Sequence, residues 1–117
     1  MARPEKGDPG FLLDMLLAAE DAIGFVAGMD EAAFRASALH QAAVLRCVSV
    51  IGEAANRVSK EFRSGTSQVP WKAVIGMRHK LVHDYAEVRL DVVWRVVSVE
   101  LPALAAALRP LVPPEPR

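Results

Sequence analysis

The strongest constraint on the fold is one apolar pattern at helical spacing in the middle of this 117-residue chain. It starts after Ser37, a residue type that caps helix N-termini, and continues to Phe62, over roughly six turns. Apolar residues recur there every three or four positions, which is typical of an amphipathic helix. We therefore expect one long helix as the spine of the fold, with its apolar face at Leu39, Ala42, Ala43, Leu45, Val48, Ile51, Ala55, Val58 and Phe62.

Two helices are expected before this spine. Asp8 followed by Pro9 is a typical helix start, with an N-cap residue and proline in the first turn. Apolar residues then recur at helical spacing until Gly28, where the pattern stops. Asp30 is expected to cap a short extra helix that carries Phe34.

Two more helices are expected after the spine. Residues Arg63 to Pro70 are polar and contain Gly and Pro, so they predict a loop in which the chain reverses. Trp71 opens the next apolar pattern, which lapses after Tyr85, and Asp91 is expected to cap the last helix. Pro102 lies inside that helix and predicts a kink, because proline lacks an N–H and its ring clashes with the preceding turn.

Together these elements predict an all-α fold, an antiparallel bundle of four main helices with one short extra helix. Hydrophobic residues make up 52% of the chain and aromatic ones only 6%, which favours an aliphatic helix core. A chain of this length buries roughly 65% of its unfolded surface, enough for one modest core. We expect a single domain over residues 1–110 and a frayed, proline-rich tail over residues 111–117.

Cysteine use and apolar content indicate the compartment. Cys47 is the single cysteine, so no intramolecular disulfide forms, and it is expected to be a small buried or interface group rather than a nucleophile. The first apolar stretch is broken by Asp14, Glu20 and Asp21, unlike a secretion signal. No run of about 18 apolar residues is present, so we expect a cytoplasmic protein that does not enter a membrane.

The charges are balanced overall but unevenly distributed. The 14 basic and 14 acidic residues give a net charge of zero, which disfavours a protein that coats nucleic acid non-specifically. Residues 1–56 carry 4 basic and 8 acidic side chains, whereas residues 57–117 carry 10 and 6. A polyanion would therefore approach the second half of the chain.

Reactive side chains are concentrated in one short stretch of that second half. Within eight residues the chain places a guanidinium, two imidazoles, an ammonium, a carboxylate and a phenol. On an ideal helix His83 would lie about 140° around the axis from Arg78. The two side chains therefore converge only if the helix ends near His83 or if a second chain completes the site. The stretch consists of Arg78, His79, Lys80, His83, Asp84 and Tyr85.

This stretch resembles the motif of the HepT-like toxins, a branch of the HEPN superfamily of all-helical RNases: arginine, four residues, histidine, one residue, tyrosine. The resemblance continues along the chain in the order of the family and covers about residues 11–109. It rests on the segments Val50-Ile51-Gly52-Glu53-Ala54-Ala55, Val69-Pro70-Trp71, Arg78-His79-Lys80-Leu81-Val82-His83-Asp84-Tyr85, Asp91-Val92-Val93-Trp94 and Leu101-Pro102.

The resemblance implies a homodimer in which two motif segments face each other across a composite site. It implies metal-independent RNA cleavage without a cofactor, with Arg78 and His83 as catalytic residues. It also implies a toxin of a type VII-like toxin–antitoxin module, neutralised by a nucleotidyltransferase partner that adds AMP to Tyr85. The chain departs from the family at His79, where the family usually has asparagine.

The chemistry of these side chains fits that role. The 2′-hydroxyl of RNA can attack the adjacent phosphorus when a base takes its proton and a cation stabilises the phosphoryl oxygens. An unperturbed histidine changes charge near neutral pH, so His83 can act as base or acid, and Arg78 carries a permanent charge in a fork that matches phosphate. Tyr85 can donate a hydrogen bond to phosphate or stack on a base. Supporting roles are expected for His79, Lys80, Asp84 and Glu53, the last by holding Arg78 or His79 unless it lies at the surface.

Other interpretations remain open from the residues alone. The chain could be a non-catalytic HEPN module that binds a nucleotidyltransferase or a nucleotide, or a helical adaptor that binds only protein. His79 and His83, four residues apart, could share a metal, but no third ligand is evident in the sequence. Trp71 and Trp94 are expected to be core anchors rather than surfaces for stacking RNA bases.

Overall fold

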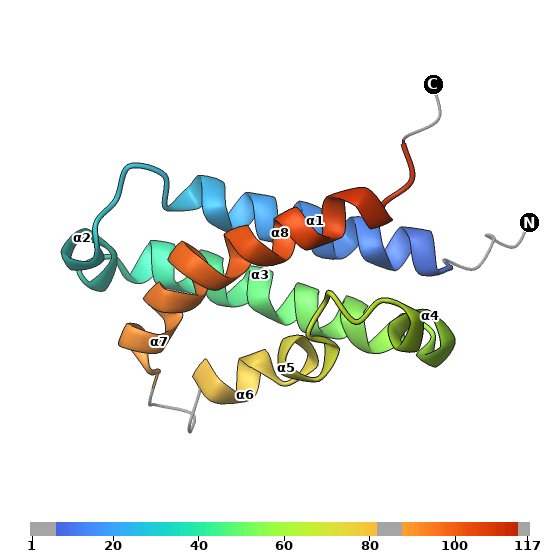
Figure 1. Cartoon of the computed structure of the whole chain (residues 1–117). Coiled ribbons are helices and arrows are strands. Elements are labelled where there is room, and N and C mark those ends of the chain that lie inside the picture. The colour runs from blue at the N-terminus through green and yellow to red at the C-terminus, as the bar shows by residue number, and fades with distance from the viewer. Residues whose placement is uncertain (1–6, 82–87, 115–117) are drawn as a thin grey trace, which may run out of the picture.

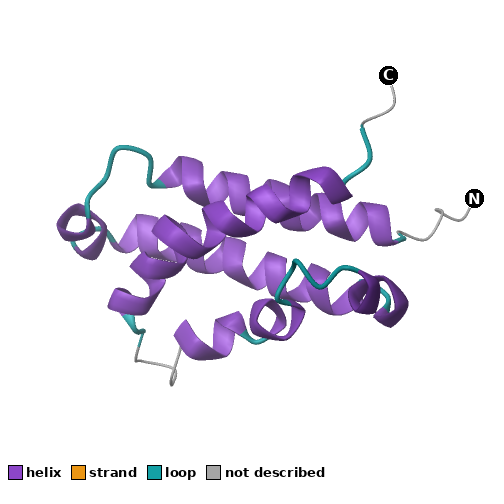
Figure 2. Cartoon of the chain, in the orientation of Figure 1, coloured by secondary structure: helices purple, strands orange, loops and turns teal. Residues whose placement is uncertain are grey.

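The structure is a computed structural model that describes residues 7–81 and 88–114. Every regular element in these two ranges is helical, and Figure 2 shows no strand in them. The predicted all-α class is therefore confirmed. The elements are α1 (Asp8–Phe25), α2 (Glu31–Arg35), α3 (Ala38–Arg57), α4 (Lys60–Gly65), α5 (Trp71–Ile75), α6 (Met77–Leu81), α7 (Leu90–Arg95), the π-helix η1 (Val96–Glu100), α8 (Leu101–Leu108) and the 3₁₀-helix η2 (Arg109–Leu111).

The helix α3 lies between two layers. Helix α1 packs along one side of α3 and also contacts α8, while α5 and α6 contact α3 from another side (Figure 1). Figure 1 also shows that α3 and α8 run in the direction opposite to α1, so these helices are antiparallel. The core contains no buried polar or charged residue among those described. Its largest fully buried side chains include Phe34, Leu12, Met15, Ile51, Leu81, Leu101 and Leu108.

Of the four predicted helix caps, those at Asp30 and Ser37 are confirmed, and those at Asp8 and Asp91 are wrong. The carboxylate of Asp30 accepts from the N–H of Ala33 at 2.8 Å, and the Ser37 hydroxyl accepts from the N–H of His40 at 3.3 Å. Asp8, however, is the first residue of α1, and Gly7 occupies the N-cap. The Asp8 carboxylate is engaged elsewhere, because its two oxygens accept from the backbone N–H and the hydroxyl of Ser59 at 2.8 and 2.7 Å.

That contact explains why the predicted spine is broken. The prediction of one helix through Phe62 is wrong, since α3 ends at Arg57 and Val58 is extended, with φ −64° and ψ 138°. Ser59 then caps α4, its hydroxyl accepting from the N–H of Phe62 at 3.1 Å. Val58 is still buried, so the apolar pattern continues across a break that the cap and the Asp8 contact produce.

The fourth predicted helix is also divided. Its first part, α5, ends at Ile75, and α6 begins at Met77 after Gly76. Glycine weakens a helix interior because it loses more backbone freedom on folding than other residues, so a break here is inexpensive. The described residues thus form three long helical bodies, α1, α3 and the continuous run from α7 to α8, and a bundle of four long helices is not confirmed.

The last helical body begins at Leu90, two residues before the Val92 start that an Asp91 cap predicts. Asp91 is not its cap, because α7 starts at Leu90, and the Asp91 carboxylate lies 3.7 Å from Nε of Arg89. A kink at Pro102 is not confirmed. The irregular turn is the π-helix η1, which precedes Pro102, and proline occupies the first turn of α8, where its missing N–H is tolerated. Figure 1 shows α7 and α8 running in different directions on either side of η1.

The remaining sequence expectations concern the chain reversals and the aromatic residues. Of the loop predicted from Arg63 to Pro70, the first three residues belong to α4. The indole N–H of Trp71 donates to the carbonyl of Thr66 at 3.1 Å, and its ring meets Phe62 edge-on. Trp94 packs on Phe34 with ring centroids 5.4 Å apart, so both tryptophans are core anchors as predicted.

The C-terminal residues described reach beyond α8. Leu111 and Val112, at the start of the tail expected to fray, are partly buried against the core.

In the described ranges, no helix has both the length and the apolar content needed to cross a membrane.

The Asp8–Ser59 contact predicts a clear effect on stability. Ser59→Ala removes the cap of α4 and one of the two donors to the Asp8 carboxylate, the hydroxyl, while the backbone N–H of residue 59 remains. We expect a loss of about 1–2 kcal/mol in the free energy of unfolding, measured by urea denaturation. Ser67→Ala, at an exposed turn residue, is the matched control. Equal unfolding midpoints for the two variants would contradict the role given to Ser59.

Candidate functional site

Helix α6 displays the first half of the reactive stretch. Its two ends are anchored, since Met77 is 5% exposed and Leu81 is fully buried, one helical turn apart. The three residues between them, Arg78, His79 and Lys80, are exposed. The apolar anchors therefore fix the helix on the core while the guanidinium, imidazole and ammonium face solvent.

The second half of the stretch lies outside the described residues. His83, Asp84 and Tyr85 all belong to residues 82–87, so their predicted convergence with Arg78 stays a prediction. The described residues on either side of this segment are joined, because the N–H of Arg89 donates to the carbonyl of Leu81 at 2.9 Å. The described residues that precede and follow the segment with the predicted catalytic histidine therefore meet next to α6.

A close approach between α3 and α5 sets the position of α6. Gly52 of α3 faces the C-terminal carbonyls of α5, and a Cβ at this position would lie 3.5 Å from the oxygen of Ile75 and 3.7 Å from that of Val74. A larger side chain would push α5 away from α3. Because only Gly76 separates α5 from α6, the position of Arg78 depends on this contact.

Glu53, the residue after Gly52, is exposed on α3. No hydrogen bond or ion pair joins it to Arg78 or His79 within the described part of the chain. The sequence left two positions open for Glu53, one in contact with Arg78 or His79 and one at the surface, and the structure places it at the surface. A supporting role for Glu53 toward the motif stays a prediction.

The structure also brings together basic residues that the sequence motifs do not single out. Lys60, Arg63 and Lys72 line one hollow beside α4 and α5, and Lys72 and Lys80 line a second. The positive balance of residues 57–117 is the sequence signal that points to them. Only the structure shows that these residues lie on successive short helices.

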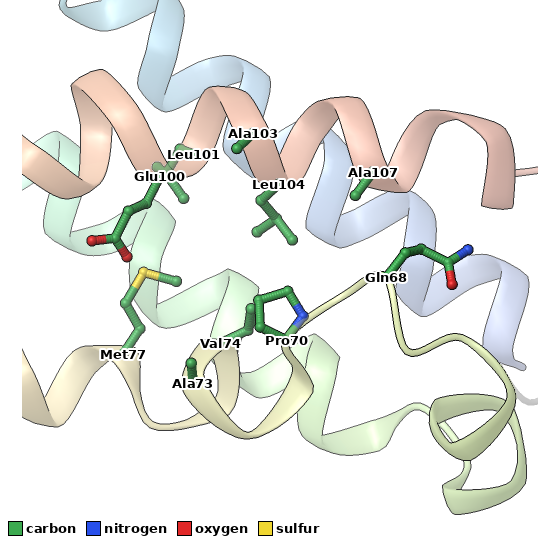
Figure 3. A pocket seen from close by; sticks show the side chains of 10 residues that line it. All are labelled: Gln68, Pro70, Ala73, Val74, Met77, Glu100, Leu101, Ala103, Leu104 and Ala107. Atoms are coloured by element: carbon green, nitrogen blue, oxygen red, sulfur yellow. The ribbon is translucent and has the colours of Figure 1, made fainter.

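A further hollow of about 230 Å³ lies between α5, α6 and α8 (Figure 3). Its walls are mainly apolar, with Leu101, Leu104 and Val74 among them. Figure 3 shows Glu100 and Met77 at one end and Gln68 at the other. Since Glu100 is its one titratable residue among those described, the hollow lacks a paired acid and base and is not the reactive centre.

The burial of Cys47 bears on its reactivity, whereas a metal shared by His79 and His83 stays a hypothesis, because His83 lies outside the described residues. Cys47 is 7% exposed, and burial raises the pKa of its thiol, with the charge of Asp21 adding to the rise. A raised pKa disfavours the reactive thiolate, in agreement with the predicted inert role. Among the described residues, no group of three or more His, Cys, Asp or Glu side chains is placed to hold a metal ion.

Comparison with known proteins identifies the family. The model of the family described as "Ribonuclease HepT-like" matches residues 15–111, which include α6 and the whole reactive stretch. The chain belongs to the HepT-like ribonuclease family. The resemblance carried by Arg78, His83 and Tyr85 is thereby confirmed, as is the prediction of a ribonuclease-type enzyme at the level of the family.

Individual HepT-like relatives come from archaea and bacteria. "Putative RNase MJ0125" of Methanocaldococcus jannaschii is 36% identical over 101 residues, which are 86% of this chain and 87% of the relative. "Putative RNase TTE0752" of Caldanaerobacter subterraneus subsp. tengcongensis is 38% identical over 73 residues, covering 62% of this chain and 65% of the relative. "Probable ribonuclease HepT" of Thermococcus cleftensis is 36% identical over 64 residues, covering 55% and 58%. No solved structure matches the chain significantly.

The contact at Gly52 predicts opposite effects for two substitutions. Gly52→Ala adds a methyl group at ordinary van der Waals distance and removes a helix-interior glycine, so we expect unchanged to slightly higher stability, by up to about 1 kcal/mol. Gly52→Leu overfills the α3–α5 contact and should cost about 1–3 kcal/mol. Thermal unfolding of both variants tests this, and a leucine variant as stable as the alanine variant would contradict the close approach.

Proposed function

We propose that this HepT-like protein is a metal-independent endoribonuclease whose composite site forms between two copies of the chain. The observation that carries the proposal is the construction of α6. Two buried residues hold the helix, and Arg78, His79 and Lys80 project from it at the point where the segment with His83 begins. A permanently charged guanidinium next to a histidine is the minimum that phosphodiester transfer through the 2′-hydroxyl requires.

The reaction follows from ordinary acid–base chemistry. A neutral His83 imidazole takes the proton of the 2′-hydroxyl, and the 2′-oxygen forms a bond to phosphorus. The bond from phosphorus to the 5′-oxygen breaks, and that oxygen takes a proton from an acid. Arg78 stabilises the charge on the non-bridging oxygens, and the second motif of a dimer supplies the groups that one chain does not. The products are a cyclic 2′,3′-phosphate and a free 5′-hydroxyl.

The proposal includes control by a nucleotidyltransferase antitoxin, as in a type VII-like toxin–antitoxin module. In this step the Tyr85 oxygen bonds to the α-phosphorus of ATP and pyrophosphate leaves. An AMP on Tyr85 places a negative charge and a base next to Arg78 and His83, where a substrate phosphate would bind. Inhibition then follows from repulsion and volume.

Loss of the histidine should abolish the reaction. We expect His83→Ala to lower RNA cleavage by roughly 10²-fold or more and to remove growth arrest on induced expression without a partner. His40→Ala, at a histidine on α3 far along the chain from the motif, is the matched control and should cleave as the wild type does.

Both variants should remain dimers in sedimentation experiments. Full cleavage by His83→Ala would remove this residue from the mechanism. Soluble wild-type protein that leaves RNA intact would favour the alternative of a non-catalytic HEPN module, to which the histidine at position 79 points.

The proposed modification site is tested by a substitution that removes a single oxygen atom. Tyr85 is the one tyrosine of the chain, and Tyr85→Phe removes only its hydroxyl oxygen. With the nucleotidyltransferase and ATP, the wild type should gain the mass of one or more AMP units and Tyr85→Phe should gain none. A mass gain that persists in the phenylalanine variant would assign the modification to another residue.

A further inference from the structure

Two shallow hollows join on one side of the molecule. One, of about 600 Å³, is lined by Asn56, Lys60, Arg63, Ser64, Trp71, Lys72 and Ile75. The other, of about 590 Å³, is lined by Pro70, Trp71, Lys72, Ala73, Gly76 and Lys80. Trp71 and Lys72 belong to both, so the hollows form one continuous depression. We name its four cations, Lys60, Arg63, Lys72 and Lys80, the basic strip.

The basic strip leads to the candidate active site. Its residues lie on α4, α5 and α6, which follow one another beside α3 (Figure 1). Lys80, at the α6 end, is two residues from Arg78 and three from His83 along the chain. A strand bound along the depression would therefore have one end at the motif.

No described acidic residue is paired with the basic strip. Lys60, Lys72 and Lys80 are exposed, and none of the four cations forms an ion pair with a described Asp or Glu. Among the described residues that line the two hollows, none is acidic. Other arginines of the chain are neutralised, for example Arg35 by Glu31 at 3.0 Å.

Arg63 adds charge rather than a free hydrogen-bond donor. This residue is half-buried, and its Nε is enclosed by protein without a hydrogen-bond partner. Because this nitrogen is enclosed, it cannot itself meet a ligand, and Arg63 contributes to the wall of the depression through the permanent charge of its guanidinium. Phosphate oxygens are the acceptors that a guanidinium matches best.

Among the described residues that line the depression, none offers an exposed ring for a base to stack on. Trp71 is 8% exposed, and its indole N–H already donates to the carbonyl and hydroxyl oxygens of Thr66 at 3.1 and 3.2 Å. Base recognition needs exposed aromatic faces or free hydrogen-bonding edges, whereas phosphate recognition needs cations. The chemistry of the surface therefore selects the backbone of a nucleic acid.

We propose that the basic strip is a backbone-binding subsite for single-stranded RNA, which holds the substrate beyond the nucleotides that are cleaved. This inference rests on the proposed function for the identity of the polyanion. Binding there is independent of sequence and depends strongly on salt, since each phosphate contact releases condensed counterions. The strip increases the number of nucleotides that the protein holds and does not select the bond that is cut.

The test compares two double variants of the full chain. Lys60→Gln with Lys72→Gln removes two charges from the basic strip, and Arg35→Gln with Arg46→Gln removes two exposed charges elsewhere. The probe is a fluorescent 2′-O-methyl oligouridylate of about 12 nucleotides, which cannot be cut through its 2′-oxygen. Its affinity for each protein is measured by fluorescence anisotropy over a range of salt concentrations.

The strip variant should bind the probe roughly tenfold more weakly at about 0.1 M salt, and its plot of log K against log salt should be shallower by about 1.4. The control variant should match the wild type. Equal affinities for all three proteins, or equal losses in the two double variants, would overturn the inference. If the strip binds an acidic protein and not RNA, the three proteins should bind the probe with equal affinity.

Cleavage of unmodified RNA by the wild type separates this inference from the proposed function. A wild type that cleaves RNA while the strip variant binds like the control refutes the subsite and leaves the ribonuclease standing. A wild type that leaves RNA intact while its binding depends on Lys60 and Lys72 refutes the proposed catalysis and supports the subsite.

Discussion

The fold depends on the burial of α3 from two sides. Its residues Val44, Val48, Ile51 and Ala55 are completely buried, and α1 packs on one side of the helix while α5 and α6 pack on another. The apolar face of α3 therefore decides where the short helices lie, and through them where the reactive stretch is displayed.

This arrangement separates stability from chemistry. The described core has no buried polar or charged residue, and the described ionisable residues of the reactive stretch, Arg78, His79 and Lys80, lie at the surface. On α6 the two functions alternate within five residues, with Met77 and Leu81 turned to the core and the charged residues between them turned outward. Burial thus positions the cations without the desolvation that would disfavour their charge.

The helical class and two caps followed from the sequence because they depend on local patterns. Asp30 and Ser37 each accept from an N–H three residues on, a contact that the local chain alone specifies. The break at Val58 was beyond such reasoning, because it depends on Asp8, 51 residues away from Ser59. Val58 keeps its place in the apolar pattern, so spacing alone cannot reveal that the helix has ended.

The candidate site divides in the same way. A local motif and the order of segments around it identified the family, and they named Arg78 as a site residue that the structure then places on an exposed helix. Lys60, Arg63 and Lys72 belong to no motif, and only the fold brings them to one depression. The net charge of +4 over residues 57–117 predicted which half of the chain a polyanion would approach, but not on which face of the fold the cations lie.

The uneven charge has a directional consequence for any approaching polyanion. Asp14 and Asp21 line the hollow between α1 and α3 beside Arg46, so that face carries both signs. The depression along α4, α5 and α6 carries cations without a described acidic lining residue. Since the net charge is zero, the long-range attraction of a polyanion is weak. Within a Debye length of about 10 Å at 0.1 M salt, the charges of the nearest side chains decide whether a polyanion is attracted. The local charge therefore favours the approach of a polyanion along the depression that leads to α6 over its approach to the face of Asp14 and Asp21.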